Sequence, residues 1–208
     1  MIEKDVQEIC DKAFANHKAT LIQNTERYLI IDWRREDGSG EYYVNYIVDK
    51  KRGSLIVSGD LGDSIATWYN PIDPSVLKRW VKNDTGYYIS KFQCTTNDFV
   101  YTAEDIVSDI KEQLARCDEE DIIMACEDKT YFYGDTLDEV WGYLIEEIEE
   151  SCLMRNNSVF TPTEYITKFL EELDPDYWEW LYDCGKKIHR RVYLWADGFY
   201  KACEQLGI

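Results

Sequence analysis

The sequence predicts an α+β protein in which an N-terminal helix and an antiparallel meander sheet are followed by a C-terminal helical lobe. In the first half of the chain, short stretches of alternating apolar and polar residues are separated by turn residues. From Thr102 onward the apolar spacing becomes helical, and strands followed by helices are typical of α+β rather than of a parallel βαβ sheet. We therefore expect a sheet domain at residues 1–101 and an acidic helical lobe at residues 102–208, sharing one continuous core.

The elements of the sheet domain follow from periodicity and turn chemistry. Apolar residues at helical spacing predict the first helix over residues 3–16. Asp73 followed by Pro74 is typical of a helix start and predicts a helix that ends near Asn83. Glycine-containing turns separate most of the alternating stretches, and such short connections favour antiparallel neighbours. The predicted strands cover residues 19–23, 28–34, 41–49, 54–59, 64–69 and 87–94.

The helical lobe is predicted from capping residues and proline positions. Thr102, with Asp105 three residues later, resembles a capping box. Pro162 and Pro175 each follow a polar residue, which is a start signal for the last two helices. The predicted helices cover residues 102–117, 136–152, 161–173 and 176–205.

The charge of the chain is concentrated in this lobe. The protein has 41 acidic and 23 basic residues, a net charge of −18. Residues 1–102 contain 15 acids and 13 bases, residues 103–184 contain 24 acids and only 5 bases, and residues 185–208 carry a net charge of +3. So acidic a segment repels nucleic acid and attracts basic protein surfaces. Direct nucleic-acid binding is therefore not expected, and a basic partner is.

Two interpretations of the acidic helices remain open. They are the solvated side of amphipathic helices, or they form a functional surface that occupies a groove built for phosphates. Like charges at i,i+4, such as Glu146 and Glu150, destabilise a helix, and no basic residue on that helix offsets them. This favours the functional interpretation. The acidic residues predicted to contact a partner are Asp118, Glu119, Glu120, Asp121, Asp135, Asp138, Glu139, Glu146, Glu149 and Glu150.

Aromatic residues near the C-terminus predict a further contact. In the expected last helix, Tyr177, Trp180 and Leu181 follow core spacing, whereas Trp178 and Tyr182 lie one turn apart on another side. Exposed Trp and Tyr residues are typical binding hot spots. We therefore predict Trp178 and Tyr182 as partner contacts.

Catalytic chemistry is less well supported by the sequence. Asp32, Asp60 and Asp63 are carboxylates at predicted strand ends and are candidates for holding Mg²⁺ in a nuclease, although an Asp-Leu-Gly-Asp stretch is equally typical of a plain turn. The two histidines, His17 and His189, have no nucleophile motif near them, and no glycine-rich phosphate-binding loop occurs. No catalytic residue, metal site or cofactor is predicted.

Cysteine usage and hydropathy indicate a cytoplasmic protein. The seven cysteines are an odd number, widely scattered and without metal-site spacing, which favours reduced thiols. The N-terminus has no signal-peptide pattern, and no apolar run is long enough to span a membrane.

Part of the chain resembles a known group of proteins. The stretches Arg27–Trp33, Lys51–Ser64 and Gly86–Cys94 are similar to segments of small, largely uncharacterised proteins from phages and mobile elements of Gram-positive bacteria. Small acidic phage proteins of this sort include anti-CRISPR proteins, which bind a CRISPR effector nuclease and block its guide or target DNA. The resemblance covers about residues 27–94, carries no catalytic motif, and implies an anti-defence role.

These observations predict a non-enzymatic inhibitor of a host nucleic-acid-handling protein, namely a CRISPR effector, that uses an acidic surface to mimic nucleic acid. One alternative is a metal-dependent nuclease that acts on guide RNA or DNA through Asp32, Asp60 and Asp63. Another is an acidic immunity or adaptor protein that binds a basic partner.

Overall fold

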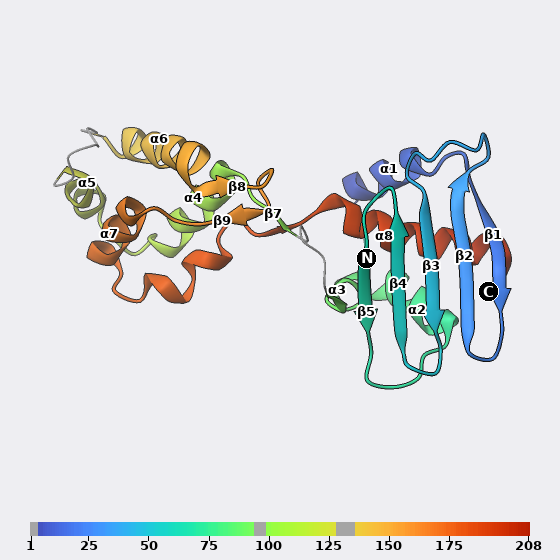
Figure 1. Ribbon diagram of the computed structural model, residues 1–208. Helices are drawn as coiled ribbons and strands as arrows, with labels where there is room; N and C mark the ends of the chain where they lie inside the picture. The colour runs from blue at the N-terminus through green and yellow to red at the C-terminus, as the bar shows by residue number, and fades with distance from the viewer. Residues whose placement is uncertain (1–3, 94–98, 128–135) are drawn as a thin grey trace. The chain divides into compact units, whose positions relative to one another are not determined.

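The chain folds into two compact units (Figure 1). The computed structural model describes residues 4–93, 99–127 and 136–208. The first unit comprises Met1–Thr96 together with His189–Ile208, and we call it the sheet unit. The second comprises Asn97–Ile188, and we call it the helical unit. The sheet unit is therefore discontinuous in sequence, and the helical unit is inserted into it.

The sheet unit contains a six-stranded antiparallel meander, which confirms the predicted fold class. Neighbouring strands in the sheet are also neighbours in the sequence, from β1 to β6, because the connections between β1 and β5 are only three to eight residues long. The strands are β1 (His17–Asn24), β2 (Tyr28–Arg35), β3 (Val44–Asp49), β4 (Ser54–Gly59), β5 (Ser64–Thr67) and β6 (Phe92–Gln93).

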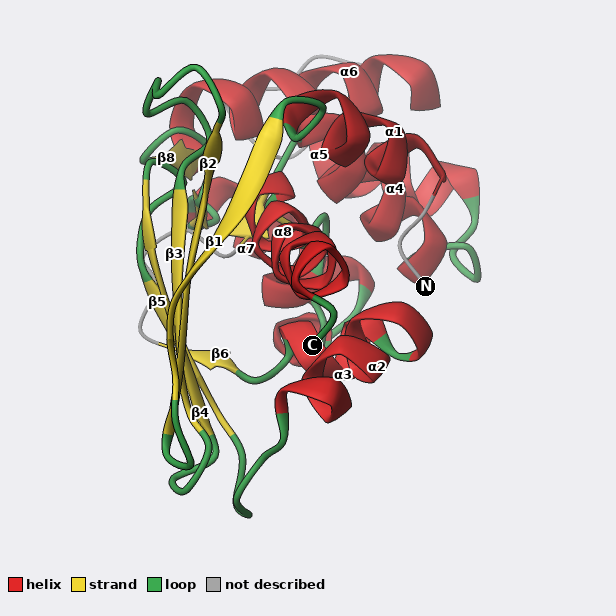
Figure 2. Cartoon of the chain, turned by 90° about the vertical axis from the view of Figure 1, so that its right-hand side faces the viewer, coloured by secondary structure: helices red, strands yellow, loops and turns green. Residues whose placement is uncertain are grey.

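One side of this sheet is buried by helices and the other is not. In β2, Leu29, Ile31 and Trp33 are almost fully buried, while the residues between them are partly exposed, as a period of two requires. Figure 2 shows the covering helices of the sheet unit together on one side of the sheet. These helices are α1 (Lys4–Ala13), α2 (Pro74–Asn83), α3 (Thr85–Ile89) and α8 (Arg190–Leu206).

Helix α8 is the central element of the sheet unit's core. It packs against α1, α2, α3 and strands β1 to β3. Its residues Trp195 and Phe199 are fully buried, and the Tyr46 hydroxyl from β3 donates a hydrogen bond of 2.9 Å to the Trp195 carbonyl oxygen. The helix begins at a His189 cap, whose Nδ1 accepts the Arg191 N–H at 3.1 Å, and ends at Gly207 with φ of 67°.

The predicted helix over residues 176–205 is wrong in its first half. Two 3₁₀ turns, η2 (Tyr177–Glu179) and η3 (Leu181–Asp183), and the short strand β10 (Lys187–Ile188) precede α8. Asp174 explains the turns, because its buried carboxylate accepts hydrogen bonds from the Asp176 N–H at 3.1 Å and the Trp180 indole at 3.3 Å. Gly185, with φ of 65°, then prevents helical continuation.

The predicted strand over residues 87–94 is also largely replaced. Helix α3 occupies Thr85–Ile89, and only Phe92–Gln93 extend as β6, which pairs with β5. The side chain of Asp84 caps α3 by accepting the Tyr87 N–H at 3.2 Å. By contrast, α2 begins as predicted, with Asp73 accepting the Ser75 N–H at 2.9 Å.

The helical unit has its own apolar core. Ile106, Leu144 and Phe169, from three different helices, are fully buried in it. Thr102 caps the first helix as predicted, with its Oγ1 accepting the Asp105 N–H at 3.2 Å. Helix α5 was not predicted. The elements are β7 (Phe99–Val100), α4 (Ala103–Gln113), α5 (Glu119–Glu127), α6 (Leu137–Glu147), the π-helical turn η1 (Ile148–Cys152), β8 (Leu153–Met154), β9 (Val159–Phe160) and α7 (Glu164–Leu173), followed by η2, η3 and β10.

Candidate acidic interaction surface

The net charge of the protein lies entirely in one of its two units. The helical unit contains 25 Asp and Glu residues against 7 Lys and Arg residues, a formal charge of −18. The sheet unit contains 16 of each sign and is formally neutral. A unit with this much charge of one sign creates a strong negative field, because opposite charges are too few to cancel it.

The carboxylates predicted as contacts are available to a partner. All nine that lie in the described ranges are exposed, and none of them takes part in an ion pair there. Asp135, the tenth, lies outside the described residues. Four of the seven bases of the helical unit pair with other carboxylates, through Arg116–Asp174, Lys168–Glu164, Lys186–Asp183 and Lys187–Asp105.

Some of these carboxylates stabilise the helices to which they belong, which the interpretation of the sequence did not consider. Glu119, Glu120 and Asp121 form the first turn of α5, where the helix dipole favours negative charge. Asp138 has the same position in α6. Glu139 completes a capping box, since its carboxylate accepts the Thr136 N–H at 3.1 Å while Thr136 Oγ1 accepts the Glu139 N–H at 3.4 Å. These five acids therefore stabilise the fold whether or not they contact a partner.

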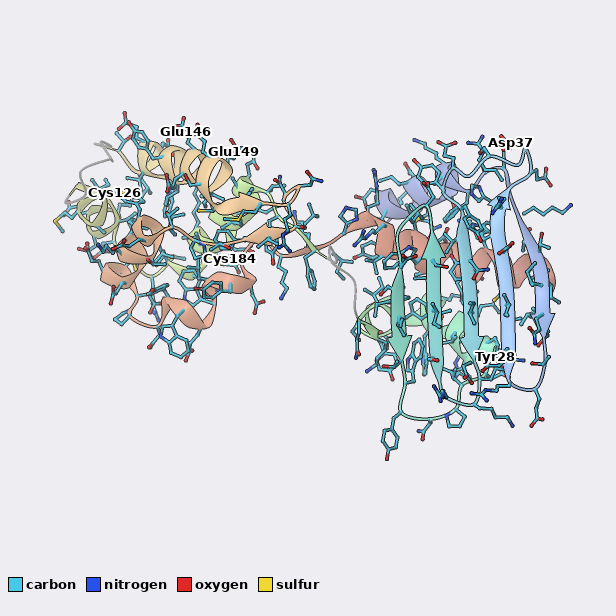
Figure 3. All side chains as sticks on the ribbon, in the orientation of Figure 1. Tyr28, Asp37, Cys126, Glu146, Glu149 and Cys184 are labelled. Carbon is cyan, nitrogen blue, oxygen red and sulfur yellow. The ribbon has the colours of Figure 1, made fainter. Side chains whose placement is uncertain are left out.

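The acids at the C-terminal end of α6 do not stabilise their helix in this way. Glu146, Glu149 and Glu150 lie where the helix dipole disfavours negative charge, and the last turn contains no basic residue. Figure 3 shows the side chains of Glu146 and Glu149 projecting outward from this helix. The π-helical turn η1 begins at Ile148, so that the regular i,i+4 spacing assumed for Glu146 and Glu150 does not continue through this segment. We call Glu146, Glu149 and Glu150 the α6 acidic end.

The predicted aromatic contacts do not join the α6 acidic end. Trp178 and Tyr182 are each 58% exposed, the level expected for an accessible contact. They belong to η2 and η3, however, and not to one helical face. Figure 1 shows α6 along one side of the helical unit and the orange-red turns between α7 and β10 along the opposite side. The predicted contacts therefore form at least two separate surfaces.

A groove between α5 and α7 was not predicted from the sequence. It has a volume of about 350 Å³ and is lined by Cys117, Asp121, Met124, Ala125, Glu172 and Leu173. Carboxylates thus come from both helices, and the Met124 side chain, which is 56% exposed, supplies apolar surface beside them. The groove joins residues more than 45 positions apart, so that no local sequence pattern indicates it.

The residues of the alternative nuclease site have ordinary structural roles. Asp32 accepts hydrogen bonds from the Asn45 side chain at 2.6 Å and the Tyr43 hydroxyl at 3.3 Å. Asp60 accepts the Tyr42 N–H at 2.8 Å, and Asp63 is exposed. Within the described ranges, no three potential metal-ligating side chains come together. These contacts favour the turn interpretation of the Asp-Leu-Gly-Asp stretch.

The histidines and the buried thiols Cys10 and Cys184 likewise have places in the fold and do not line the groove. His17 is 5% exposed and its ring contacts Phe14 and Trp33, while His189 caps α8. Burial raises the pKa of the Cys10 and Cys184 thiols to about 12, which makes them poor nucleophiles at neutral pH. Among the described helices, none is long and apolar enough to cross a membrane.

Comparison with known proteins adds no relative to this picture. No protein-family model, curated protein or solved structure matches the chain.

Proposed function

We propose that the helical unit binds a basic, nucleic-acid-handling protein of a bacterial host and inhibits it by occupying the surface that otherwise holds phosphates. The observation that carries this proposal is the segregation of charge, with −18 on the helical unit and none on the sheet unit. A protein selected only to fold has no need of this separation, because interspersed charges avoid the self-repulsion. The partner suggested by the resemblance of residues 27–94 is a CRISPR effector nuclease in the cytoplasm.

The α6 acidic end is the first contact in this proposal. Its three carboxylates, Glu146, Glu149 and Glu150, are exposed and have no cation of their own chain in the described ranges to displace. A Lys- or Arg-lined channel of the partner therefore gains these contacts without first breaking internal ion pairs. Long-range attraction also speeds the encounter and makes it sensitive to salt.

The groove between α5 and α7 is the second contact. Lysine and arginine side chains have apolar stems and charged heads. Met124 offers apolar surface to the stem, and Asp121 lies at the groove to meet the charge. Trp178 and Tyr182, on the side away from α6, serve as anchors only for a partner large enough to enclose the helical unit.

The test uses the full chain and a guide-loaded CRISPR effector. Affinity is measured by biolayer interferometry at 50 mM and 300 mM NaCl. The triple variant Glu146→Gln/Glu149→Gln/Glu150→Gln is compared with Glu8→Gln/Glu36→Gln/Asp63→Asn, which changes the net charge equally at exposed positions of the sheet unit. We expect the first variant to lose at least tenfold in affinity, the second less than twofold, and the wild-type affinity to fall steeply with salt.

Competition with nucleic acid separates this function from the alternatives. A labelled target DNA bound to the effector should be displaced by the wild-type chain and not by the α6 variant. Equal losses in both triple variants, or affinity indifferent to salt, would remove the α6 acidic end from the mechanism. Binding to a basic toxin but to no effector would favour an immunity or adaptor protein.

A further inference from the structure

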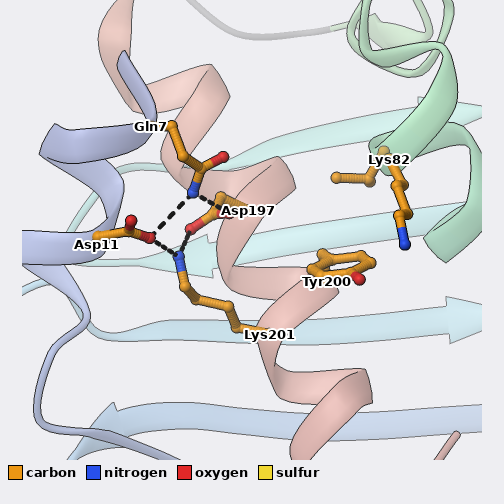
Figure 4. Close-up of a pocket in the computed structure, with 7 residues that line it drawn as sticks. Gln7, Asp11, Lys82, Asp197, Tyr200 and Lys201 are labelled. Carbon is orange, nitrogen blue, oxygen red and sulfur yellow. Dashed lines mark hydrogen bonds and ion pairs between the residues drawn. The ribbon is translucent and has the colours of Figure 1, made fainter. Parts of the chain in front are cut away.

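The sheet unit contains a pocket that is independent of the acidic surface (Figure 4). It lies between α1, α2 and α8 and has a volume of about 340 Å³. This is at the lower end of the range of about 300–1,000 Å³ that is usual for small-molecule sites. The lining residues are Gln7, Asp11, Val81, Lys82, Asp197, Tyr200 and Lys201.

One wall of the pocket is a polar network whose charges are already paired. The Gln7 amide donates to Asp11 and to the buried Asp197, each at 3.0 Å, and Lys201 also donates to both carboxylates. Burial acts to lower the pKa of Lys201, but the bonds to Asp11 and Asp197 outweigh it and the pKa is raised. Figure 4 shows these four side chains converging. The network therefore offers a ligand no unpaired cation.

The α2 side of the pocket contains a positive charge that is not paired. Lys78 binds Glu204 of α8 at 2.9 Å, which fixes how the two helices face each other. Lys82, one turn further along α2, lines the pocket with Tyr200, one turn before Glu204. Lys82 is exposed and makes no ion pair or hydrogen bond within the described ranges. Within the same ranges, the Tyr200 hydroxyl makes no hydrogen bond. An ammonium and a phenol are thus both available as donors.

We propose that this pocket binds a small organic anion with a single carboxylate and an apolar body. The carboxylate bonds to Lys82 and the Tyr200 hydroxyl, since charge-assisted hydrogen bonds favour an ionised acceptor. The apolar body lies against Val81, the Tyr200 ring and the methylene groups of Gln7 and Lys201. A monoanion is favoured over a dianion because, among the described residues, only one unpaired cation lines the pocket, and the carboxylates of Asp11 and Asp197 form the opposite wall.

The experiment titrates the ¹⁵N-labelled full chain with sodium octanoate at constant ionic strength, followed by NMR. We expect saturable shifts at Lys82 and Tyr200, and affinity about tenfold weaker in Lys82→Met. The control is Lys12→Met, an exposed lysine of α1 that does not line the pocket, and its affinity should equal that of the wild type. 1-Octanol and octylammonium should bind at least tenfold more weakly than octanoate, and octyl phosphate tests the choice of carboxylate.

Several outcomes overturn the proposal. These are unchanged octanoate affinity in Lys82→Met, 1-octanol binding as tightly as octanoate, or shifts confined to residues outside α1, α2 and α8. Tighter binding of octyl phosphate would assign the pocket to a phosphate monoester instead. Absence of saturable binding up to about 10 mM would leave the pocket without an organic-anion ligand of this class.

Discussion

Gly185 lies near the C-terminal end of the helical unit. Its backbone has a conformation that only glycine adopts without strain. Its φ is 65°, and a Cβ added there would lie 2.4 Å from Ile106 Cγ1, 2.8 Å from Ile106 N and 3.0 Å from Ile106 Cα. The last two atoms are backbone of α4 and cannot swing away. The Gly185 N–H also donates to Asp109 at 2.7 Å, which holds the two segments together.

Replacing Gly185 by alanine should therefore destabilise the helical unit substantially. The left-handed conformation costs alanine about 1–2 kcal/mol. Overpacking against Ile106 adds about 1–3 kcal/mol. We expect the free energy of unfolding to fall by about 2–5 kcal/mol in total, a large part of the stability of a domain of this size.

Gly142 provides a matched control of opposite sign. It lies inside α6, where an added Cβ would meet no atom of the described residues within 4 Å apart from its own helix. Gly142→Ala should stabilise the helix by about 0.5–1 kcal/mol, because alanine loses less backbone freedom on folding. Urea unfolding followed by circular dichroism gives both values, and hydrogen exchange of α4 amides assigns the change to the helical unit. A Gly185→Ala variant within about 0.5 kcal/mol of the wild type would refute the reasoning.

Two further predictions concern the sheet unit. Burial lowers the pKa of His17, so that below about pH 6.5 the unfolded chain binds a proton that the folded chain does not. The free energy of unfolding should therefore decrease as the pH falls from 7 to 5, and His17→Gln should reduce this slope in urea titrations. Burial also lowers the pKa of His189, which contributes to the slope that remains. Asp73→Ala should cost about 1 kcal/mol by removing the α2 cap, whereas Asp73→Asn should retain most of it. The hydrogen bonds from Ser75 lower the pKa of Asp73 in the folded state. The contribution of the cap to stability is therefore present above the pKa of Asp73 in the unfolded chain, and it is lost as the pH falls through the pKa in the folded state. An equal loss of stability in both variants at pH 7 would contradict a capping role.

The parts of the fold that sequence reasoning recovered are those fixed by local chemistry. Alternation in residues 28–34 gave β2, because half-buried strands repeat every two residues. Asp73 and Thr102 marked helix starts correctly, since a cap is made by a side chain and an N–H two or three residues away. Each of these signals is complete within a few residues.

The parts that escaped depend on distant contacts. The helix expected from residue 176 is interrupted by Gly185, whose N–H partner Asp109 is 76 residues earlier in the chain. The assignment of α8 to the sheet unit depends on contacts with β1 to β3, which no local pattern encodes. Helical periodicity also cannot place α6 relative to Trp178, so that the separation of the acidic from the aromatic contacts was not predicted. The pocket beside Lys82 draws on three helices and left no local signal at all.

The discontinuous sheet unit has a consequence for synthesis of the protein. When the ribosome has made residues 1–96, Trp195 and Phe199 do not yet exist, and the inner side of the sheet lacks the central helix of its core. The 92 residues of the insertion take roughly 5–20 s to translate at about 5–20 residues per second. During that interval the nascent strands expose apolar surface, while the insertion can complete its own core first, so the segment made earliest is the last to reach its native state.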